Sequence, residues 1–225
     1  MTQEDSCIRI LNKKEKIMEI KVVDPISLVV FENVFEESQR KEMFLELSDH
    51  VKEKSLLSPD KTGSAKNEDG SLKKKNSALF LDGLYESQQE RDKSAILRNT
   101  EDVLLSYEMK LKLKEINPFY GILNKVNKHF TLINYYEDSD FYDFHEDESA
   151  FSILTFLFKD PRSFSGGNVI FRVSGKEFEV KVKDNMSVIF PSCYEHKVIP
   201  IKMNQISDKE PLGRFSIAQF LHVNG

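Results

Sequence analysis

Short runs of β-branched and aromatic residues fill the chain after Phe130, and they constrain the fold more than any other feature. The runs are TLINYY, FSILTFLF, NVIFRV, EFEVKVK, SVIF, HKVIPI and RFSIAQFLHV, with turn segments DPRSFSGG, KDN and PSCYE between them. Runs of this kind bounded by turn residues predict β-strands. In EFEVKVK, Phe178, Val180 and Val182 alternate with charged residues, which predicts one buried face. FSILTFLF is apolar almost throughout, so we expect both its faces to be covered.

The first half of the chain predicts helices instead. Apolar residues recur at helical spacing from Glu36 to Lys54 and from Ser94 to Glu115, and a third helix is expected to start at Asn117-Pro118. About seven or eight strands after these helices predict a double-sheet architecture. We therefore predict an α+β fold, a double-stranded β-helix (jelly roll) core with bracing N-terminal helices. One domain is expected over residues 1–225, helix-rich over about 1–129 and jelly roll over about 130–223.

Composition argues against several functional classes. Hydrophobic residues make up 40% of the 225 residues, and 37 acidic against 32 basic side chains give a net charge of −5. The short run Lys73-Lys74-Lys75 is the one basic cluster, so no nucleic-acid partner is expected. No apolar stretch approaches the roughly 20 residues that span a bilayer, and the first twenty residues do not resemble a signal peptide. The default expectation is a soluble, cytoplasmic protein with no membrane partner.

The segment from Ser58 to Ser77 is polar, with two glycines, one proline and almost nothing to bury. A loop of this length is usually functional or disordered. The sequence leaves open whether it is a solvated, disordered loop or a lid on the substrate side of a site.

Three residues in the second half predict a metal site. His145 and Asp147 lie in YDFHEDES, and two residues separated by one position on an extended chain point the same way. His196, in YEHKVIP, is the natural third ligand. Two His and one carboxylate form the facial triad of non-haem iron(II) oxygenases. Taken singly, His145 could be a surface loop histidine and His196 a satisfied strand histidine.

Four ordered motifs connect these residues to a known family. The first, YEDSDFYDFHED, contains Tyr136, Tyr142 and the His-x-Asp pair, and the second, SFSGGNVIF, contains Gly166 and Gly167. The third is SVIFPSCYEHKVIPI, and the last is GRFSIAQF, with Gly213 and Arg214. Over residues 130 to 223 the sequence resembles the prolyl 4-hydroxylase-like, 2-oxoglutarate-dependent oxygenases.

The resemblance implies a dioxygenase that uses Fe(II), O2 and 2-oxoglutarate to hydroxylate an unactivated carbon, with ascorbate as the candidate reductant. It implies His145, Asp147 and His196 as catalytic metal ligands. Arg214 is expected to bind the far carboxylate of the oxoacid, because a guanidinium binds carboxylate in bidentate fashion. Tyr136 and Ser216 would add hydroxyl donors, or else be core residues. The two glycines of the second motif are expected to serve a turn.

The sequence departs from the family in the interval of 18 residues between His196 and Arg214, where KMNQISDKEPL is expected to be an inserted polar loop with Lys202 and Lys209 in solvent. A nucleic-acid demethylase would carry a second Arg where Phe220 stands. A non-catalytic jelly-roll binding module and a cupin-type metal enzyme remain as alternatives. The substrate is expected to be a protein or peptide residue by fold analogy, with a free amino acid or small molecule as the alternative. The sequence does not indicate the oligomeric state.

Overall fold

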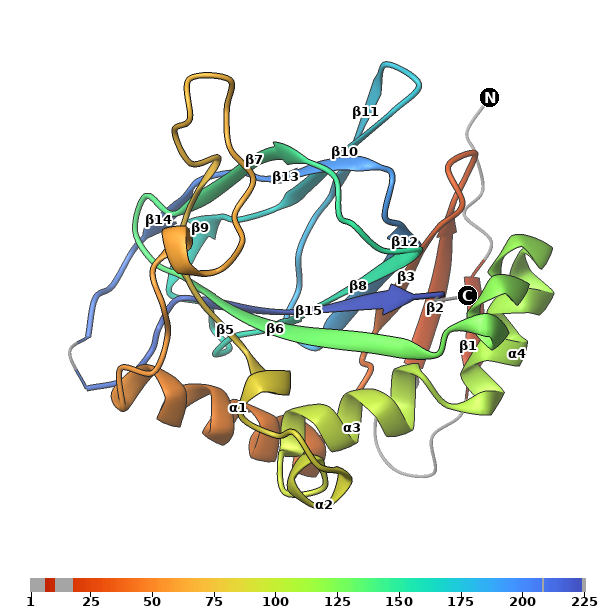
Figure 1. The fold of residues 1–225 in the computed structure, drawn as a ribbon, viewed down its shortest axis with the longest axis horizontal. Helices are drawn as coiled ribbons and strands as arrows, with labels where there is room; N and C mark the ends of the chain where they lie inside the picture. Colours follow the sequence, from red (N-terminus) through yellow and green to blue (C-terminus); the bar gives the residue numbers. More distant parts are fainter. Residues whose placement is uncertain (1–6, 11–17, 208, 224–225) are drawn as a thin grey trace.

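The computed structural model describes residues 7–10, 18–207 and 209–223 and consists mainly of β-sheet (Figure 1). The strands are β1 (Cys7–Ile10), β2 (Met18–Val23), β3 (Leu28–Glu32), β4 (Lys74–Lys75), β5 (Ser77–Phe80), β6 (Lys128–Tyr136), β7 (Phe141–His145), β8 (Phe151–Leu157), β9 (Phe164–Gly166), β10 (Val169–Val173), β11 (Lys176–Val180), β12 (Met186–Pro191), β13 (Glu195–Val198), β14 (Ile201–Met203) and β15 (Arg214–His222). The helices are α1 (Glu37–Lys52), α2 (Gln88–Arg91), α3 (Ala95–Leu104) and α4 (Tyr107–Ile116), with 3-10 helices η1 (Pro59–Lys61), η2 (Leu81–Gly83) and η3 (Pro118–Lys125).

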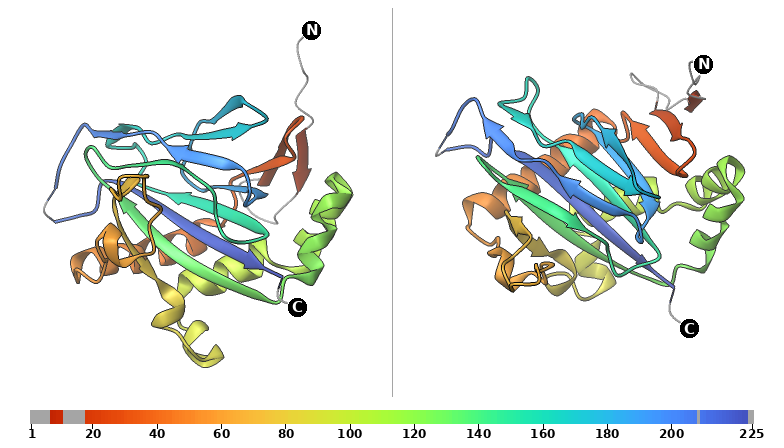
Figure 2. Two further views of the ribbon diagram at one scale, coloured as in Figure 1. Left: turned by 45° about the horizontal axis from the view of Figure 1, so that its top comes forward. Right: turned by 90° about the horizontal axis from the view of Figure 1, so that it is seen from above.

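Two sheets face each other across the interior. The large sheet has the order β1-β2-β3-β12-β8-β15-β6-β5, and the small sheet has the order β11-β10-β13-β7-β4. A separate pair joins β14 to β9. Helices α1 and α3 lie along the face of the large sheet that points away from the small sheet (Figures 1 and 2). No helix in the described ranges has both the length and the hydropathy needed to cross a membrane.

The alternation of side chains along the central strands divides the interior into two hydrophobic clusters. On β6 and β15, Ile133 and Ile217 join the helices in one cluster, whereas Leu132 and Ala218 join the small sheet in the other. Successive side chains of a strand point to opposite faces, so a strand with both faces covered must be apolar throughout. All seven residues of β8 are buried, as the sequence predicted for FSILTFLF.

The helices agree with the sequence in part. Helix α1 was expected over Glu36 to Lys54 and is confirmed, with Glu36 and Gln39 forming a capping box. The single helix expected from Ser94 to Glu115 is wrong. Two helices occupy that range, because the Ser106 side chain accepts a hydrogen bond from the Met109 amide and starts α4. The helix expected at Asn117-Pro118 is the 3-10 helix η3.

Every run named as a strand after Phe130 contains a strand, but the first half is not purely helical. Strands β2 and β3 form a hairpin that extends the large sheet through β12. The expected loop KMNQISDKEPL begins within β14, which pairs with β9, while Lys202 and Lys209 are exposed as predicted. The segment from Ser58 to Ser77 has defined structure. It contains η1 and β4, and its bridge Lys66↔Leu72 closes a turn beside β7.

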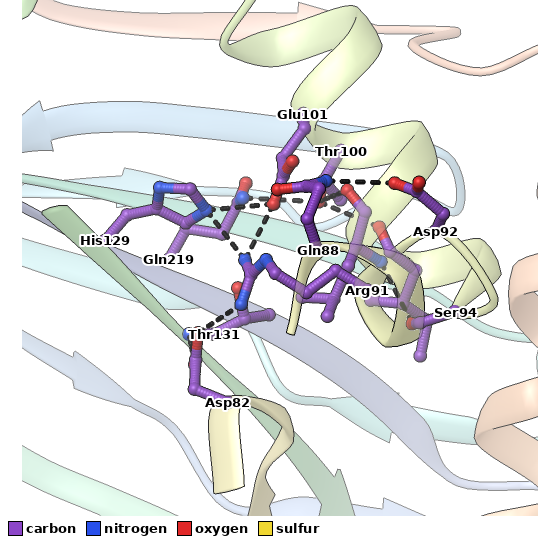
Figure 3. Close-up of polar contacts among 12 residues, drawn as sticks. Asp82, Gln88, Arg91, Asp92, Ser94, Thr100, Glu101, His129, Thr131 and Gln219 are labelled. Carbon is purple, nitrogen blue, oxygen red and sulfur yellow. Dashed lines mark hydrogen bonds and ion pairs between the residues drawn. The ribbon is translucent and has the colours of Figure 1, made fainter. Parts of the chain in front are cut away.

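An ion-pair cluster fastens the helices to the large sheet (Figure 3). Arg91 of α2 donates to Asp82 at 2.8 Å and to Glu101 of α3 at 2.7 Å. Asp82 in turn accepts from the backbone amide of Thr131 on β6, and Glu101 lies 3.0 Å from His129 on the same strand. These contacts fix the helix layer relative to β6. The opposite face of β6 lines a cavity.

Candidate metal centre

Strands β7 and β13 place two histidines opposite each other. In this antiparallel pair His145 is the register partner of His196, and their ring centroids lie 4.2 Å apart. Asp147 follows just past the end of β7. Its two carboxylate oxygens lie 3.8 Å from His145 Nε2 and 3.7 Å from His196 Nε2. One ligand atom from each residue lies within 4.8 Å of the other two, so the three residues could together hold a metal ion.

Backbone contacts leave the Nε2 atom of each imidazole available. His145 Nδ1 donates to the Asp143 carbonyl oxygen at 2.8 Å, and His196 Nδ1 donates to the Tyr194 carbonyl oxygen at 3.0 Å. A carbonyl oxygen can only accept, so the proton of a neutral ring is on Nδ1 and the lone pair is on Nε2. Burial holds the pKa of His145 well below its usual value, and the neighbouring His196 lowers it further. His145 is therefore a neutral ring at physiological pH, as metal ligation requires.

Serine hydroxyls orient the carboxylate. Ser152 Oγ on β8 donates to Asp147 Oδ2 at 2.5 Å, and the Asp147 amide donates to the Ser192 carbonyl oxygen at 3.1 Å. The hydroxyls of Ser152 and Ser192 also lie 2.9 Å apart. Contacts of this kind around a ligand fix its direction and tune its affinity for metal.

A cavity of about 330 Å³ opens beside these three side chains, between the two sheets. Its floor consists of alternate residues of the two central strands of the large sheet, which point to the small sheet: Leu132, Asn134 and Tyr136 from β6, with Ser216, Ala218 and Phe220 from β15. Thr62, Gly63 and Ala65 of the 58–77 segment form part of the wall. The volume is in the range of small-molecule sites.

Arg214 is the register partner of Tyr136, which lines this cavity. Arg214 is not itself among the lining residues and is fully buried at 0% exposure. Its Nη1 donates to the Gly167 carbonyl oxygen, and its guanidinium carbon lies 4.4 Å from the centroid of the Tyr136 ring. Its Nε and Nη2 atoms have no hydrogen-bond partner among the described residues. Burial lowers the pKa of Arg214 to about 10, and the Tyr136 hydroxyl offsets part of that shift. The guanidinium is therefore charged at neutral pH and lacks partners for two of its nitrogens.

The remaining residues singled out in the sequence lie around the same cavity. Tyr136 and Ser216 both line it, and burial raises the pKa of the Tyr136 phenol, so its hydroxyl keeps its proton. Tyr142 also lines the cavity and stacks on His145 with ring centroids 3.5 Å apart. Gly166 and Gly167 have φ of +74° and +71°, which confirms that they serve a turn. The Gly167 carbonyl oxygen in that turn accepts the hydrogen bond from Arg214.

Sequence reasoning missed Lys74, Asn134 and Ser152 at the site. Asn134 could have been found by counting two residues back along the strand from Tyr136. Ser152 could have been found only through its strand partners, because nothing in FSILTFLF distinguishes a serine that contacts a ligand from one that fills the core. Lys74 belongs to the basic run that entered the sequence-based predictions only as an argument about nucleic-acid partners.

No model of a protein family matches the sequence, and a search of curated proteins also finds no match. Solved structures do resemble the chain. A Pseudomonas putida prolyl-4-hydroxylase superposes with a TM-score of 0.63 at 14% identity, over 87% of this chain and 92% of that one.

Two further structures agree. A Trichoplax adhaerens prolyl hydroxylase in complex with a hypoxia inducible factor oxygen degradation domain peptide fragment has a TM-score of 0.56 at 12% identity, over 87% of this chain and 83% of that one. A Phytophthora capsici prolyl 4-hydroxylase has a TM-score of 0.52 at 14% identity, over 87% of this chain and 58% of that one. The resemblance indicated by the sequence motifs is thereby confirmed at the level of fold: the chain has the fold of the prolyl 4-hydroxylases.

Proposed function

We propose that this chain is an iron(II)- and 2-oxoglutarate-dependent dioxygenase that hydroxylates an unactivated carbon. One observation supports the proposal above all. Two histidines and a carboxylate converge at one end of a cavity. Arg214, the register partner of Tyr136 in the cavity lining, is a buried cation whose Nε and Nη2 have no hydrogen-bond partner among the described residues. We further infer that the two facing sheets form a jelly roll within a single domain, the architecture in which this ligand set was expected.

His145, Asp147 and His196 would hold the iron. Two imidazoles and one carboxylate are the donor set of the facial triad, which leaves coordination positions open for other ligands. The iron, with 2-oxoglutarate and O2, would supply the oxidising chemistry that hydroxylates carbon and converts the oxoacid to succinate and carbon dioxide. The residues of the chain would fix the orientation of the ligands. Ser152 orients the carboxylate, and the carbonyls of Asp143 and Tyr194 hold the two rings in the tautomer that ligates.

Arg214 would bind the far carboxylate of 2-oxoglutarate. A buried charged group is stable only when it is paired and hydrogen-bonded, and Nε and Nη2 lack partners here. A planar carboxylate matches the guanidinium and would supply both acceptors. Tyr136 and Ser216 line the cavity near Arg214 and would add hydroxyl donors to the same anion.

We propose a protein or peptide residue as the substrate, with a free amino acid or small molecule as the alternative. The Trichoplax adhaerens enzyme binds a peptide fragment, and this chain shares its fold. No nucleic-acid partner is proposed, because Phe220 stands in the cavity wall where a demethylase would carry its second Arg. A panel of proline-containing peptides and free amino acids, assayed for succinate release, tests the choice. If only free amino acids stimulate succinate release, the hypothesis of a protein or peptide substrate is refuted.

Anaerobic titration with iron(II) and 2-oxoglutarate tests the proposed cofactors. We expect a visible charge-transfer band in the wild type, its loss in His145→Ala and Asp147→Ala, and a much higher oxoacid requirement in Arg214→Ala. Circular dichroism of each variant controls for folding. If folded wild-type protein gives no band, the chain is not an oxygenase of this type and the non-catalytic binding module becomes the better description. If Arg214→Ala binds the oxoacid normally while the triad is intact, a cupin-type enzyme without an oxoacid subsite becomes the alternative.

A further inference from the structure

Three consecutive lysines at the edge of the small sheet have different environments. Lys73 Nζ donates to the Phe144 carbonyl oxygen at 2.8 Å. Lys75 Nζ donates to the Asp138 carbonyl oxygen at 3.2 Å and forms an ion pair with Asp140 at 3.4 Å. Side chains of an extended segment alternate, so Lys74 must point to the opposite side from both neighbours.

Lys74 points into the space between the sheets. It pairs with Tyr142 of β7, it forms part of the cavity wall, and it is only 4% exposed. No hydrogen bond or ion pair joins its ammonium to a described residue. Its Nζ lies over the Tyr142 ring, 5.3 Å from the ring centroid. Burial without a compensating anion lowers the pKa of Lys74 to about 8.

An anion that enters the cavity would stabilise an ammonium in this position. Lysine is almost never fully buried unless it is paired. A lysine with a purely structural role is therefore expected to pair with a carboxylate of the protein. Three carboxylates line the same cavity, those of Glu146, Asp147 and Glu148, and none of them forms an ion pair with Lys74. The Asp147 carboxylate instead contacts His145, His196 and Ser152.

Lys74 and Arg214 contact different parts of the site. Lys74 lies on β4 of the small sheet, within the 58–77 segment that forms part of the cavity wall (the orange and yellow loop next to β7 in Figure 1). Arg214 lies on β15 of the large sheet, against Gly167 and Tyr136. The oxoacid has one far carboxylate, and Arg214 already offers it two free donors, so Lys74 is left for a second anion.

We propose that Lys74 binds a carboxylate of the substrate, in a subsite separate from the one that Arg214 would provide for the oxoacid. This inference rests on the proposed oxygenase function and specifies its substrate class. Three aromatic side chains, Phe80, Phe130 and Phe220, also line the cavity. The substrate therefore has an apolar body and a carboxylate. That carboxylate can be the terminus of a peptide or amino acid, or an acidic side chain.

Oxoacid binding is the first test, with Mn(II) in place of iron(II) so that the complex is stable in air. We expect Lys74→Met to change the dissociation constant of 2-oxoglutarate by less than twofold, and Arg214→Met to raise it at least tenfold. Lys75→Met is the matched control, because it removes the same charge from the neighbouring, exposed residue. If Lys74→Met raises the dissociation constant of 2-oxoglutarate tenfold, Lys74 belongs to the oxoacid subsite and the proposal is overturned.

The second test uses 3-phenylpropanoate and its neutral amide as probes, measured by calorimetry on protein saturated with Mn(II) and 2-oxoglutarate. A charge-assisted contact predicts that the carboxylate binds at least about tenfold more tightly than the amide. This preference should disappear in Lys74→Met and persist in Lys75→Met. Equal binding of acid and amide to the wild type, or an unchanged preference in Lys74→Met, overturns the proposal.

The two proposals fail in different ways. Failure of the oxygenase function removes the charge-transfer band, whereas failure of the Lys74 subsite leaves the band and removes the acid preference. The probe pair can also be measured on the metal-free protein, where Lys74 is equally buried. Peptides that differ only in an amidated C-terminus, or only in glutamine for glutamate, then identify which carboxylate Lys74 binds.

Discussion

Replacement of Arg214 by Met is expected to stabilise the ligand-free protein. Burial lowers the pKa of Arg214 from 12.5 to about 10, which corresponds to a folding cost of about 3 kcal/mol. The shift disfavours the protonated form, so the cost is fully present below pH 10 and is relieved only as pH rises from 10 towards 12.5. Loss of the hydrogen bond to Gly167 and of the contact with the Tyr136 ring would offset about 1–2 kcal/mol. The net gain is about 1–2 kcal/mol, or about 2–8 °C in Tm, constant between about pH 6 and 9.

The same substitution should abolish the response to the oxoacid. A ligand at 100 times its dissociation constant stabilises the wild type by about 2.7 kcal/mol. If loss of the guanidinium raises the dissociation constant of 2-oxoglutarate about 100-fold, the same concentration of 2-oxoglutarate stabilises the variant by less than about 0.5 kcal/mol. Urea unfolding with Mn(II), with and without 2-oxoglutarate, measures both effects in one experiment.

Two outcomes would contradict this reasoning. A ligand-free variant at least about 2 kcal/mol less stable than the wild type would show that the guanidinium is a structural support. Equal stabilisation of variant and wild type by 2-oxoglutarate would show that the oxoacid binds elsewhere. Arg98→Met is the control, because Arg98 is a partly exposed arginine that pairs with Glu42 and donates to the Asp92 carbonyl oxygen. We expect it to change stability by less than about 0.5 kcal/mol.

Three further predictions concern other parts of the site. Because burial lowers the pKa of Lys74 from 10.5 to about 8, Lys74→Met should stabilise the ligand-free protein by up to about 3 kcal/mol at low pH. That gain should shrink as pH rises from 8 to 10.5 and the folded wild type loses the proton, as urea unfolding at about pH 6.5 and 9.5 would measure. Ser152→Ala should raise the Mn(II) dissociation constant about tenfold, because the Asp147 carboxylate loses its orienting donor, as calorimetry would measure. Gly213→Ala should cost at least about 3 kcal/mol in urea unfolding, because a Cβ there would lie 2.1 Å from the Tyr136 carbonyl oxygen.

Each of these predictions has a control. Lys75→Met is the control for Lys74→Met, and a matching dependence on pH there would mean that the burial of Lys74 is not its cause. Ser187→Ala removes a buried hydroxyl that bonds Thr155 away from the site. If Ser187→Ala raised the Mn(II) dissociation constant as much as Ser152→Ala does, the effect would come from looser packing of the protein and not from the lost contact with Asp147. At Gly83 a Cβ would have nothing within 4 Å, so Gly83→Ala should be neutral or slightly stabilising. A loss there as large as at Gly213 would mean that steric overlap is not the cause.

The strands and the candidate ligands after Phe130 could be predicted because their signals are local. A period of two and bounding turn residues define each strand, and a His-x-Asp pair on an extended chain needs no tertiary information to point one way. The hairpin of β2 and β3 was missed, although KVV and LVVF flank a proline turn in the sequence. The break between α3 and α4 was missed because Leu104, Leu105, Leu111 and Leu113 fit a single helical pattern, which conceals the cap at Ser106.

The burial of Lys74 could not be predicted, because it depends on strand pairing. Three consecutive lysines have the same local signal as any solvated charge cluster. Only the pairing of β4 with β7 decides which of them faces inward, and that pairing joins segments almost 70 residues apart: Lys74 lies opposite Tyr142. The partners of Lys73 and Lys75 are likewise a backbone carbonyl and residues of the turn before β7, which the sequence does not place.

The two buried cations have a joint consequence for folding and binding. The chain has a net charge of −5, yet Lys74 in the cavity lining and Arg214 next to Tyr136 have no carboxylate partner among the described residues. Each opposes folding through desolvation, so the ligand-free protein lacks stability that anions could restore. A ligand that binds only the folded state adds stability by mass action. If the cations serve separate carboxylates, stabilisation by 2-oxoglutarate and by 3-phenylpropanoate should add, whereas a shared subsite would make the two compete.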